Sequence, residues 1–444
     1  MSILNVNKIN PVGGGSTITI AGIASVTNNI SVGNSVTAGS FVGPIEGAVT
    51  GNVTGNVTGN VTGNVTGDAT GLSGNPSINT TGIVTATSFV PTVGQLSHRN
   101  KIINGGMNVS QRQTSSTNSS VFVVDRFKAE VTQMDQLVQT LEQSSDSPDG
   151  FGKSIKITTT TPETSIASNE QFRIQTKLEG QDFQDLEYGG SSAKTITISF
   201  YVKASVTGTF GFTVFRSEST NRVITAPYTI SSADTWERKI ITIPGDTAGA
   251  AITNDNAERF RLMWGLAAGG DYTTASSSWG NYSSANLLGG HVTNTLVTTD
   301  NASWQLAGVQ LEVGPVATPF EHRSFGEEKR LCMRYYQQYI NLQISGGYVP
   351  GTSNKANQVT FTFPVEFRAN PTASITTTGS SAGQYIYDGS GYANITALDS
   401  AGILSTTCHM NFSLNGDLTD TRSVTLGGST NTANQTTFKF TAEL

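Results

Sequence analysis

The feature that most constrains the fold is a glycine at every fourth position from Gly43 to Gly71, in the segment GPIEGAVTGNVTGNVTGNVTGNVTGDATG. A collagen triple helix needs glycine at every third residue, so this repeat excludes it. Two positions after each of the first seven glycines stands an apolar or small residue: Ile45, Val49, Val53, Val57, Val61, Val65 and Ala69. On an extended chain, Gly and Val therefore share one face, and Asn and Thr mostly occupy the other.

Such a ribbon is too thin to bury its own valines, and it becomes stable only against a partner. Further copies of the same ribbon in a closed symmetric oligomer supply that partner, and the glycines let the backbones approach closely. The repeat predicts an intertwined β shaft within residues 43–97, most simply a homotrimer. Its core would contain Ile45, Val49, Val53, Val57, Val61 and Val65. A flexible linker is the alternative, because Gly and Asn also suit a coil.

Composition favours strands over helices. Only 13% of the 444 residues are charged, about half the usual share, and Ser, Thr, Asn, Gly and Val dominate. The net charge of -6 argues against a nucleic-acid partner. The sequence has no run of about 18 apolar residues, so we expect no membrane insertion. The start, MSILNVNKINP, does not read as a signal peptide. Cys332 and Cys408 are interpreted as two buried thiols made in a reducing cytoplasm.

Strand patterns dominate the rest of the chain and predict an all-β fold. SIKITTTT, TITISFYVKA and SWQLAGVQLEV, separated by turn residues, indicate a β-sandwich over residues 98–325. Trp236, Trp264 and Trp304 lie within strand patterns, so we expect them in its core. Ser324 and Glu327 have capping-box spacing ahead of EEKRLCMRYYQQY, which predicts one short helix. The helix would begin a β-rich tip domain over residues 326–444.

Several segments carry a resemblance to known proteins. They include NVNKINP, NKIINGGMNVSQR, LEGQDFQDLEYGG and, most specifically, WQLAGVQLEVGPVATPFEHRSFGEEKRLCMRYYQ. In order and spacing they resemble tail-fibre and virion structural proteins of tailed phages of marine bacteria and cyanobacteria. The resemblance implies a jelly-roll domain similar to carbohydrate-binding modules, a receptor-facing tip, and an N-terminal region, residues 1–42, that attaches to the virion.

The resemblance also implies partners. These are two further copies of the chain, a tail or baseplate protein held by the N-terminus, and a host-surface glycan or outer-membrane receptor. We expect the protein in the virion, after assembly in the cytoplasm of a bacterial host. A fibre fixed to the capsid, collar or baseplate with a purely structural role is the alternative.

Motifs for catalysis are weak, so we expect no enzyme and no cofactor. The GSSAG segment around Ser381 spells GxSxG, but its flanks read as strands, which favours a hairpin loop over a nucleophile elbow. Asp182, Asp185 and Glu187 form the densest acidic cluster, interpreted as an exposed loop rather than catalytic carboxylates or a calcium site. The four histidines are widely separated, so no metal site is expected. A polysaccharide depolymerase would need a carboxylate pair that the sequence does not identify.

Aromatic residues give the best indication of a binding site, because an exposed ring offers sugars a flat apolar platform and often a polar handle. The stretch GDYTTASSSWGNYSS carries three of them among small polar residues, where burial looks difficult: Tyr272, Trp279 and Tyr282. In the tip, Tyr385, Tyr387 and Tyr392 flank a DGSG turn, and the first two share one strand face. Packing at a trimer seam is the alternative for the tip tyrosines.

Overall fold

A computed structural model describes residues 97–444 except 118–119, 341, 350–352, 378–383, 388–391, 419–422 and 429–435. The predicted attachment region, the shaft and its six core residues therefore lie outside the described residues. Antiparallel strands form most of the regular secondary structure of the described part, which confirms the all-β class. None of its helices is long and apolar enough to span a membrane.

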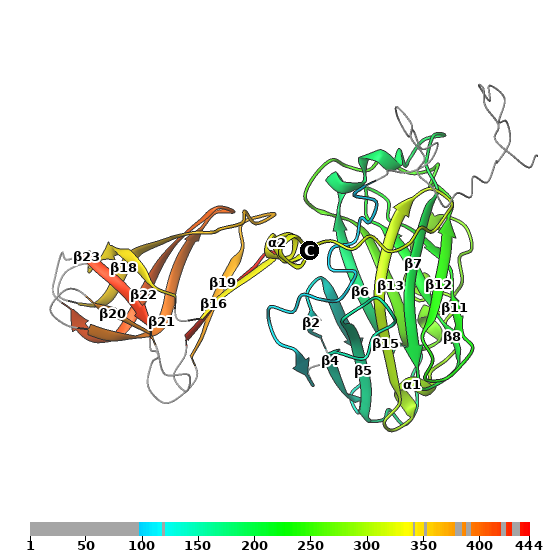
Figure 1. Ribbon diagram of the computed structural model, residues 1–444, viewed down its shortest axis with the longest axis horizontal. Coiled ribbons are helices and arrows are strands. Elements are labelled where there is room, and N and C mark those ends of the chain that lie inside the picture. The colour runs from blue at the N-terminus through cyan, green and yellow to red at the C-terminus, as the bar shows by residue number, and fades with distance from the viewer. Residues whose placement is uncertain are drawn as a thin grey trace, which may run out of the picture. The chain divides into compact units, whose positions relative to one another are not determined.

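The first body is a two-sheet sandwich (Figure 1). Its six-stranded sheet contains, in spatial order, β1 (Ser115–Ser116), β4 (Val138–Ser144), β5 (Ser154–Thr161), β15 (Ser303–Val313), β7 (Ile196–Ala204) and β12 (Glu237–Ile243). Its seven-stranded sheet contains β14 (Gly280–Asn281), β10 (Arg222–Thr225), β9 (Phe212–Arg216), β13 (Glu258–Ala268), β6 (Gln171–Glu179), β3 (Phe127–Thr132) and β2 (Phe122–Val124). Along the sequence the chain passes repeatedly from one sheet to the other, as in a jelly roll.

Shorter elements complete this body. They are the pair β8 (Gly208–Phe210) and β11 (Tyr228–Ile230), the helix α1 (Thr295–Thr298), and the 3-10 turns η2 (Gly180–Leu186), η3 (Gly270–Tyr272) and η4 (Ser284–Asn286). Between the sheets lies one large apolar core. Trp264 and Trp304 are fully buried in it, as predicted, and Phe200 meets Trp264 edge to face with ring centroids 5.8 Å apart.

The short helix forms where the sequence predicted it. In α2 (Phe325–Met333) the Ser324 side chain accepts a hydrogen bond from the Glu327 amide at 3.2 Å, which closes one half of the capping box. The predicted helical pattern continued to Tyr339, and that extension is wrong. From Tyr336 onward the chain pairs with the last strand of the protein, so backbone pairing in a sheet replaces the helix.

The second body contains a three-stranded sheet and a closed barrel. The sheet is β16 (Tyr336–Ile340), β24 (Thr436–Thr441) and β19 (Thr372–Thr377). The barrel is β17 (Ile344–Tyr348), β18 (Ser353–Thr362), β22 (Thr407–Leu418), β21 (Tyr392–Ile403), β20 (Gln384–Tyr387) and β23 (Ser423–Gly428). Both cysteines are buried free thiols, Cys332 in α2 and Cys408 in the barrel, as predicted.

Candidate functional site

The outer face of the six-stranded sheet carries polar and aromatic side chains at its centre. Alternation along β7 directs Phe200 and Val202 into the core and therefore places Tyr201 and Lys203 on the outside. In the neighbouring strand β15, Gln305 lies directly opposite Lys203. The sheet register thus brings Tyr201, Lys203 and Gln305 together on one surface.

A carboxylate from a loop organises these polar groups. Asp146 forms an ion pair with Lys203, accepts a hydrogen bond from Gln305 Nε2 at 3.0 Å, and accepts another from Trp236 Nε1 at 3.3 Å. Its backbone carbonyl is held by Ser154 Oγ at 2.6 Å. Partial burial opposes ionisation of Asp146, but the hydrogen bonds from Lys203, Gln305 and Trp236 outweigh it and lower the pKa of this carboxyl. Asp146 is therefore an ionised acceptor at neutral pH.

Trp236 does not lie in the core, so that prediction is wrong. The residue is half-buried and stands one position before β12, which is the edge strand of its sheet. Arg238, two positions later, lies opposite the outward-facing Tyr201, so the alternation of β12 directs the Trp236 ring to the outer face rather than between the sheets. The Lys203 ammonium instead lies 5.3 Å from the ring centroid, within cation–π range.

Four further rings gather beside this network. The centroid of Phe151 lies 5.5 Å from that of Tyr201, 4.9 Å from Phe320 and 5.2 Å from His322. Phe320 and His322 meet edge to face at 4.8 Å. His322 is exposed and the other three are half-buried, so each ring keeps some surface in water.

The sheet fixes the loop that supplies Phe320 and His322. Gln310 of β15 accepts a hydrogen bond from the Glu321 amide at 2.8 Å, between Phe320 and His322. Glu312 accepts one from the Thr318 amide at 3.0 Å, and Arg238 of β12 donates to the Thr318 carbonyl at 2.8 Å. The segment after β15 is therefore held against the outer face rather than free in solvent.

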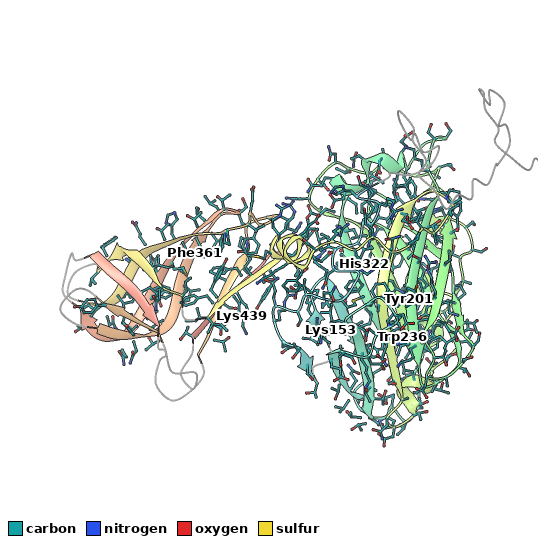
Figure 2. All side chains as sticks on the ribbon, viewed as in Figure 1. Lys153, Tyr201, Trp236, His322, Phe361 and Lys439 are labelled. Atoms are coloured by element: carbon teal, nitrogen blue, oxygen red, sulfur yellow. The ribbon has the colours of Figure 1, made fainter. Side chains whose placement is uncertain are left out.

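We call this surface the aromatic face. It consists of Phe151, Tyr201, Trp236, Phe320 and His322 together with Asp146, Lys203 and Gln305. Figure 2 labels Tyr201, Trp236 and His322, which lie along one side of the sandwich. Rings of this kind offer apolar platforms to the C–H faces of a sugar, and the carboxylate of Asp146 and the ammonium of Lys203 match its hydroxyl groups. Sequence reasoning missed this face because its members come from separate loops and strands.

The three aromatic residues predicted near residue 280 lie on the opposite sheet and are half-buried, although local burial looked difficult from the sequence. Trp279 packs against the main core, donates from Nε1 to the Pro244 carbonyl at 2.7 Å, and meets Tyr188 edge to face at 5.9 Å. Tyr272 and Tyr282 pack against a small second core on the outer face of the seven-stranded sheet. A ligand-binding role for the three residues stays a prediction.

The tip tyrosines lie in the barrel. Tyr385 and Tyr387 share one face of β20, as predicted, on either side of the fully buried Ile386, and they are 36% and 44% exposed. Tyr392 lies opposite Tyr387 in the register of β20 and β21, and its side chain lies outside the described part. Their role as glycan ligands also stays a prediction.

Lysines pair with two of the three carboxylates in the acidic cluster. Lys101 Nζ lies 2.9 Å from the Asp185 carboxylate and donates to the Asp182 carbonyl at 3.0 Å. Glu187 pairs with Lys194 at 2.8 Å. These contacts fit the interpretation of this segment as a solvated surface, although η2 replaces the expected loop.

The GxSxG segment is not a hairpin. Ser381 lies outside the described residues, and the flanks are strands as predicted, but β19 belongs to the three-stranded sheet and β20 to the barrel. The hairpin interpretation is therefore wrong, because the segment connects two different sheets.

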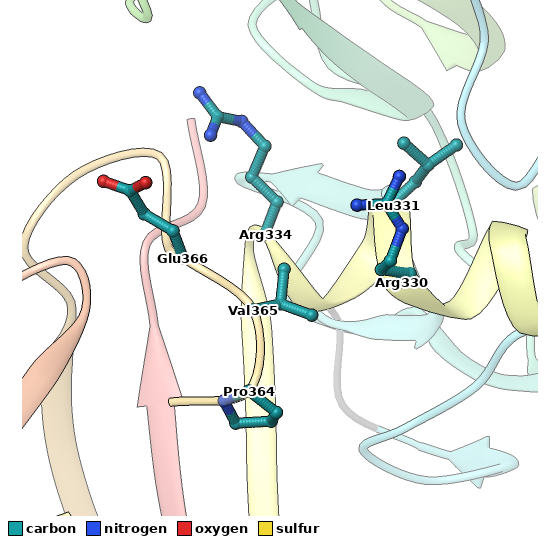
Figure 3. A pocket seen from close by; sticks show the side chains of 6 residues that line it. All are labelled: Arg330, Leu331, Arg334, Pro364, Val365 and Glu366. Atoms are coloured by element: carbon teal, nitrogen blue, oxygen red, sulfur yellow. The ribbon is translucent and has the colours of Figure 1, made fainter. Parts of the chain in front are cut away.

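A cavity of about 290 Å³ lies beside α2 (Figure 3). Its walls are Arg330, Leu331, Arg334, Pro364, Val365 and Glu366. Arg334 donates two hydrogen bonds of 2.9 Å to the fully buried carboxylate of Glu179, so its guanidinium already has a structural role. None of the residues predicted to bind a ligand lines this cavity, and we assign it no ligand.

Comparison with solved structures finds matches that cover about half of this chain. No family model and no curated protein matches the sequence. The enzymatically active domain of a tailspike from bacteriophage CBA120 matches with TM-score 0.27 and 11% identity over 48% of this chain and 21% of that one. The chain thus spans about a fifth of the tailspike's length.

Sugar-binding modules match in the same way. A family 11 carbohydrate-binding module from Clostridium thermocellum, in complex with a mixed-linked tetrasaccharide, gives TM-score 0.24 and 10% identity over 47% of this chain and 99% of that one. A candidate sugar-binding protein from Bacteroides thetaiotaomicron gives TM-score 0.28 and 12% identity over 48% of this chain and the whole of that one.

Proposed function

We propose that this chain is a non-enzymatic fibre protein of a phage virion whose sandwich binds a glycan on the host surface. The observation that carries the binding proposal is the aromatic face. Five ring side chains that keep exposed surface lie on the same face of the sheet as an ionised carboxylate and an ammonium group.

The chemistry of this face suits sugars better than other ligand classes. An oligosaccharide presents hydroxyl groups that both donate and accept hydrogen bonds. The Asp146 carboxylate can accept and the Lys203 ammonium can donate, whereas the buried amide of Gln305 holds Asp146 in place. Nucleic acid would require a surplus of cations, whereas here the ammonium of Lys203 is already paired with Asp146. A fully apolar partner would leave the polar centre without solvent or partners.

The virion part of the proposal has separate support. It rests on the resemblance of the sequence to tail-fibre proteins and on the glycine–valine repeat within residues 43–71. Attachment at the N-terminus to a tail or baseplate protein, and location in the virion, follow from that resemblance. A fibre with a purely structural role remains the alternative.

The binding proposal is tested by truncating Trp236. In this variant, Trp236→Ala, the platform beside Lys203 disappears, and we expect the affinity for host-surface polysaccharide to fall at least about tenfold, or about 1.4 kcal/mol. Isothermal titration with purified host polysaccharide measures it. Phe325→Ala, which removes a 60% exposed ring of α2 outside the face, is the matched control and should bind like the wild type.

Three results separate the alternatives. Equal affinity of the Trp236→Ala variant and the wild type would remove the aromatic face as the binding site. Loss of binding only in Tyr282→Ala or Tyr387→Ala would move the site to the residues predicted from the sequence. Release of reducing ends from the polysaccharide during incubation would contradict the non-enzymatic assignment and favour a depolymerase.

A further inference from the structure

Three carboxylates meet at the end of the sandwich that α1 occupies. Asp135 lies in the loop between β3 and β4, and Glu163 and Glu170 lie in the loop between β5 and β6. One oxygen of each lies within 4.8 Å of the other two. The Glu163 amide donates to the Val297 carbonyl of α1 at 2.9 Å, which anchors the second loop (α1 is labelled in Figure 1).

Two of these groups are almost completely buried. Glu163 is 3% exposed and Glu170 is 8% exposed, whereas Asp135 is exposed. The Glu170 carboxylate accepts a hydrogen bond from the Ala167 amide at 2.8 Å. Glu163 Oε2 is buried and has no hydrogen-bond partner among the described residues. A buried carboxylate oxygen without a partner carries a large desolvation penalty, so a missing partner is indicated at this point.

Basic side chains do not supply that partner. Within the described residues, no Lys, Arg or His lies in an ion pair with any of the three carboxylates. The acidic cluster at residues 182–187 differs, because Lys101 pairs with Asp185 and Lys194 pairs with Glu187. Three like charges this close repel one another unless a cation lies between them.

We propose that Asp135, Glu163 and Glu170 bind a calcium ion. All three ligands are hard carboxylate oxygens without sulfur or imidazole, a donor set that suits calcium or magnesium better than zinc. Calcium takes six to eight oxygens in flexible geometry, whereas magnesium requires near-ideal octahedral geometry. Because Asp135 is exposed, water molecules can complete the coordination from that side. A glycosidase role does not fit, because a sugar chain cannot reach carboxylates that are buried to this extent.

The ion would tie together two loops distant in the sequence at one end of the sandwich. Its binding is independent of the aromatic face, so this proposal does not rest on the proposed function. Because calcium would bind the folded state only, it should raise the midpoint of thermal unfolding, and the shift should grow with the logarithm of calcium concentration.

The test uses the full chain freed of metal with a chelator. Calorimetric titration should show one calcium ion bound per chain, with magnesium at least tenfold weaker, and calcium should raise the unfolding midpoint by several degrees. The Glu163→Gln variant should lose the calcium response and, in chelator, should unfold at a higher temperature than the wild type because one buried charge is gone. Asp300→Asn, at an exposed aspartate of the same domain, is the control and should respond like the wild type.

A second variant keeps the proposal falsifiable if Glu163→Gln does not fold. The Asp135→Asn variant changes only the exposed ligand and should weaken calcium binding at least tenfold. The proposal is overturned if the wild type takes up no calcium, or if both the Asp135→Asn and the Glu163→Gln variants respond to calcium like the wild type.

Discussion

At position 308 the absence of a side chain shapes the aromatic face. Gly308 has φ of +60°, in the left-handed region, and a Cβ built on it would lie 2.7 Å from Phe151 Cζ and 2.9 Å from Tyr201 Cδ2. Both rings therefore rest directly on the β15 backbone, where the pairing of β15 with β7 is irregular. A glycine meets both needs, since it tolerates positive φ and leaves the space that the rings fill.

We expect the Gly308→Ala variant to lose about 1–3 kcal/mol of unfolding free energy, because the methyl group forces the two rings apart and the backbone is strained. Glycan affinity should fall with it, since Tyr201 and Phe151 would no longer be in place. Urea denaturation and calorimetric titration measure the two effects. Gly270→Ala is the matched control, because nothing lies within 4 Å of a Cβ at that position. Stability equal to the wild type in both variants would contradict this account of Gly308.

At the scale of elements, the segment from η3 to η4 acts as a cover for the seven-stranded sheet. Tyr272, Tyr282 and Leu288 pack against Met263 and Phe215, and the Tyr282 and Phe215 rings meet edge to face at 5.1 Å. The Thr274 amide donates to the Ala285 carbonyl at 2.8 Å and closes the segment on itself. Aromatic residues surrounded by Ser, Gly and Thr can thus be structural when the neighbouring sheet supplies the apolar surface.

Trp279 is the residue of this cover that touches the main core, so its truncation should act on stability. We expect Trp279→Ala to lower the free energy of unfolding by about 1–3 kcal/mol, since a half-buried ring and its hydrogen bond to Pro244 are lost. Trp279→Phe, which keeps the ring packing and removes only the donor, should lose less. Urea denaturation compares the two. A weaker affinity for host glycan at unchanged stability would instead support the binding role that the sequence predicted.

Strands were predictable from the sequence because their signal is local. The segments SIKITTTT and SWQLAGVQLEV coincide with β5 and β15, and Ser324 caps α2 as its spacing with Glu327 indicated. The aromatic face was not predictable, because long-range contacts position it. Gln310 holds the chain at Glu321, and the register of β7 with β15 places Lys203 opposite Gln305. Tyr336 likewise lies in a strand rather than in the predicted helix because it pairs with a residue about one hundred positions away.

For the whole molecule, the sandwich and the barrel each have a core of their own, whereas the repeat within residues 43–71 has no such prospect as a single ribbon. Its fold depends on copies of itself, and this prediction concerns residues outside the described part. If the predicted trimer forms, it would present three aromatic faces to one host surface, and linked sites bind with higher avidity than single ones.

The trimer is tested with paired substitutions of opposite parity in the repeat. The wild type should sediment at about 140 kDa, three times the 46.7 kDa of one chain. Val57→Asp would bring three carboxylates onto the apolar seam, where burying charge is unfavourable, and should shift the sedimenting species to the monomer. Thr58→Asp, one residue later and on the opposite face, should leave the trimer intact. A monomeric wild type, or equal effects of the two substitutions, would rule out a valine-lined seam, and the flexible-linker interpretation of the repeat would take its place.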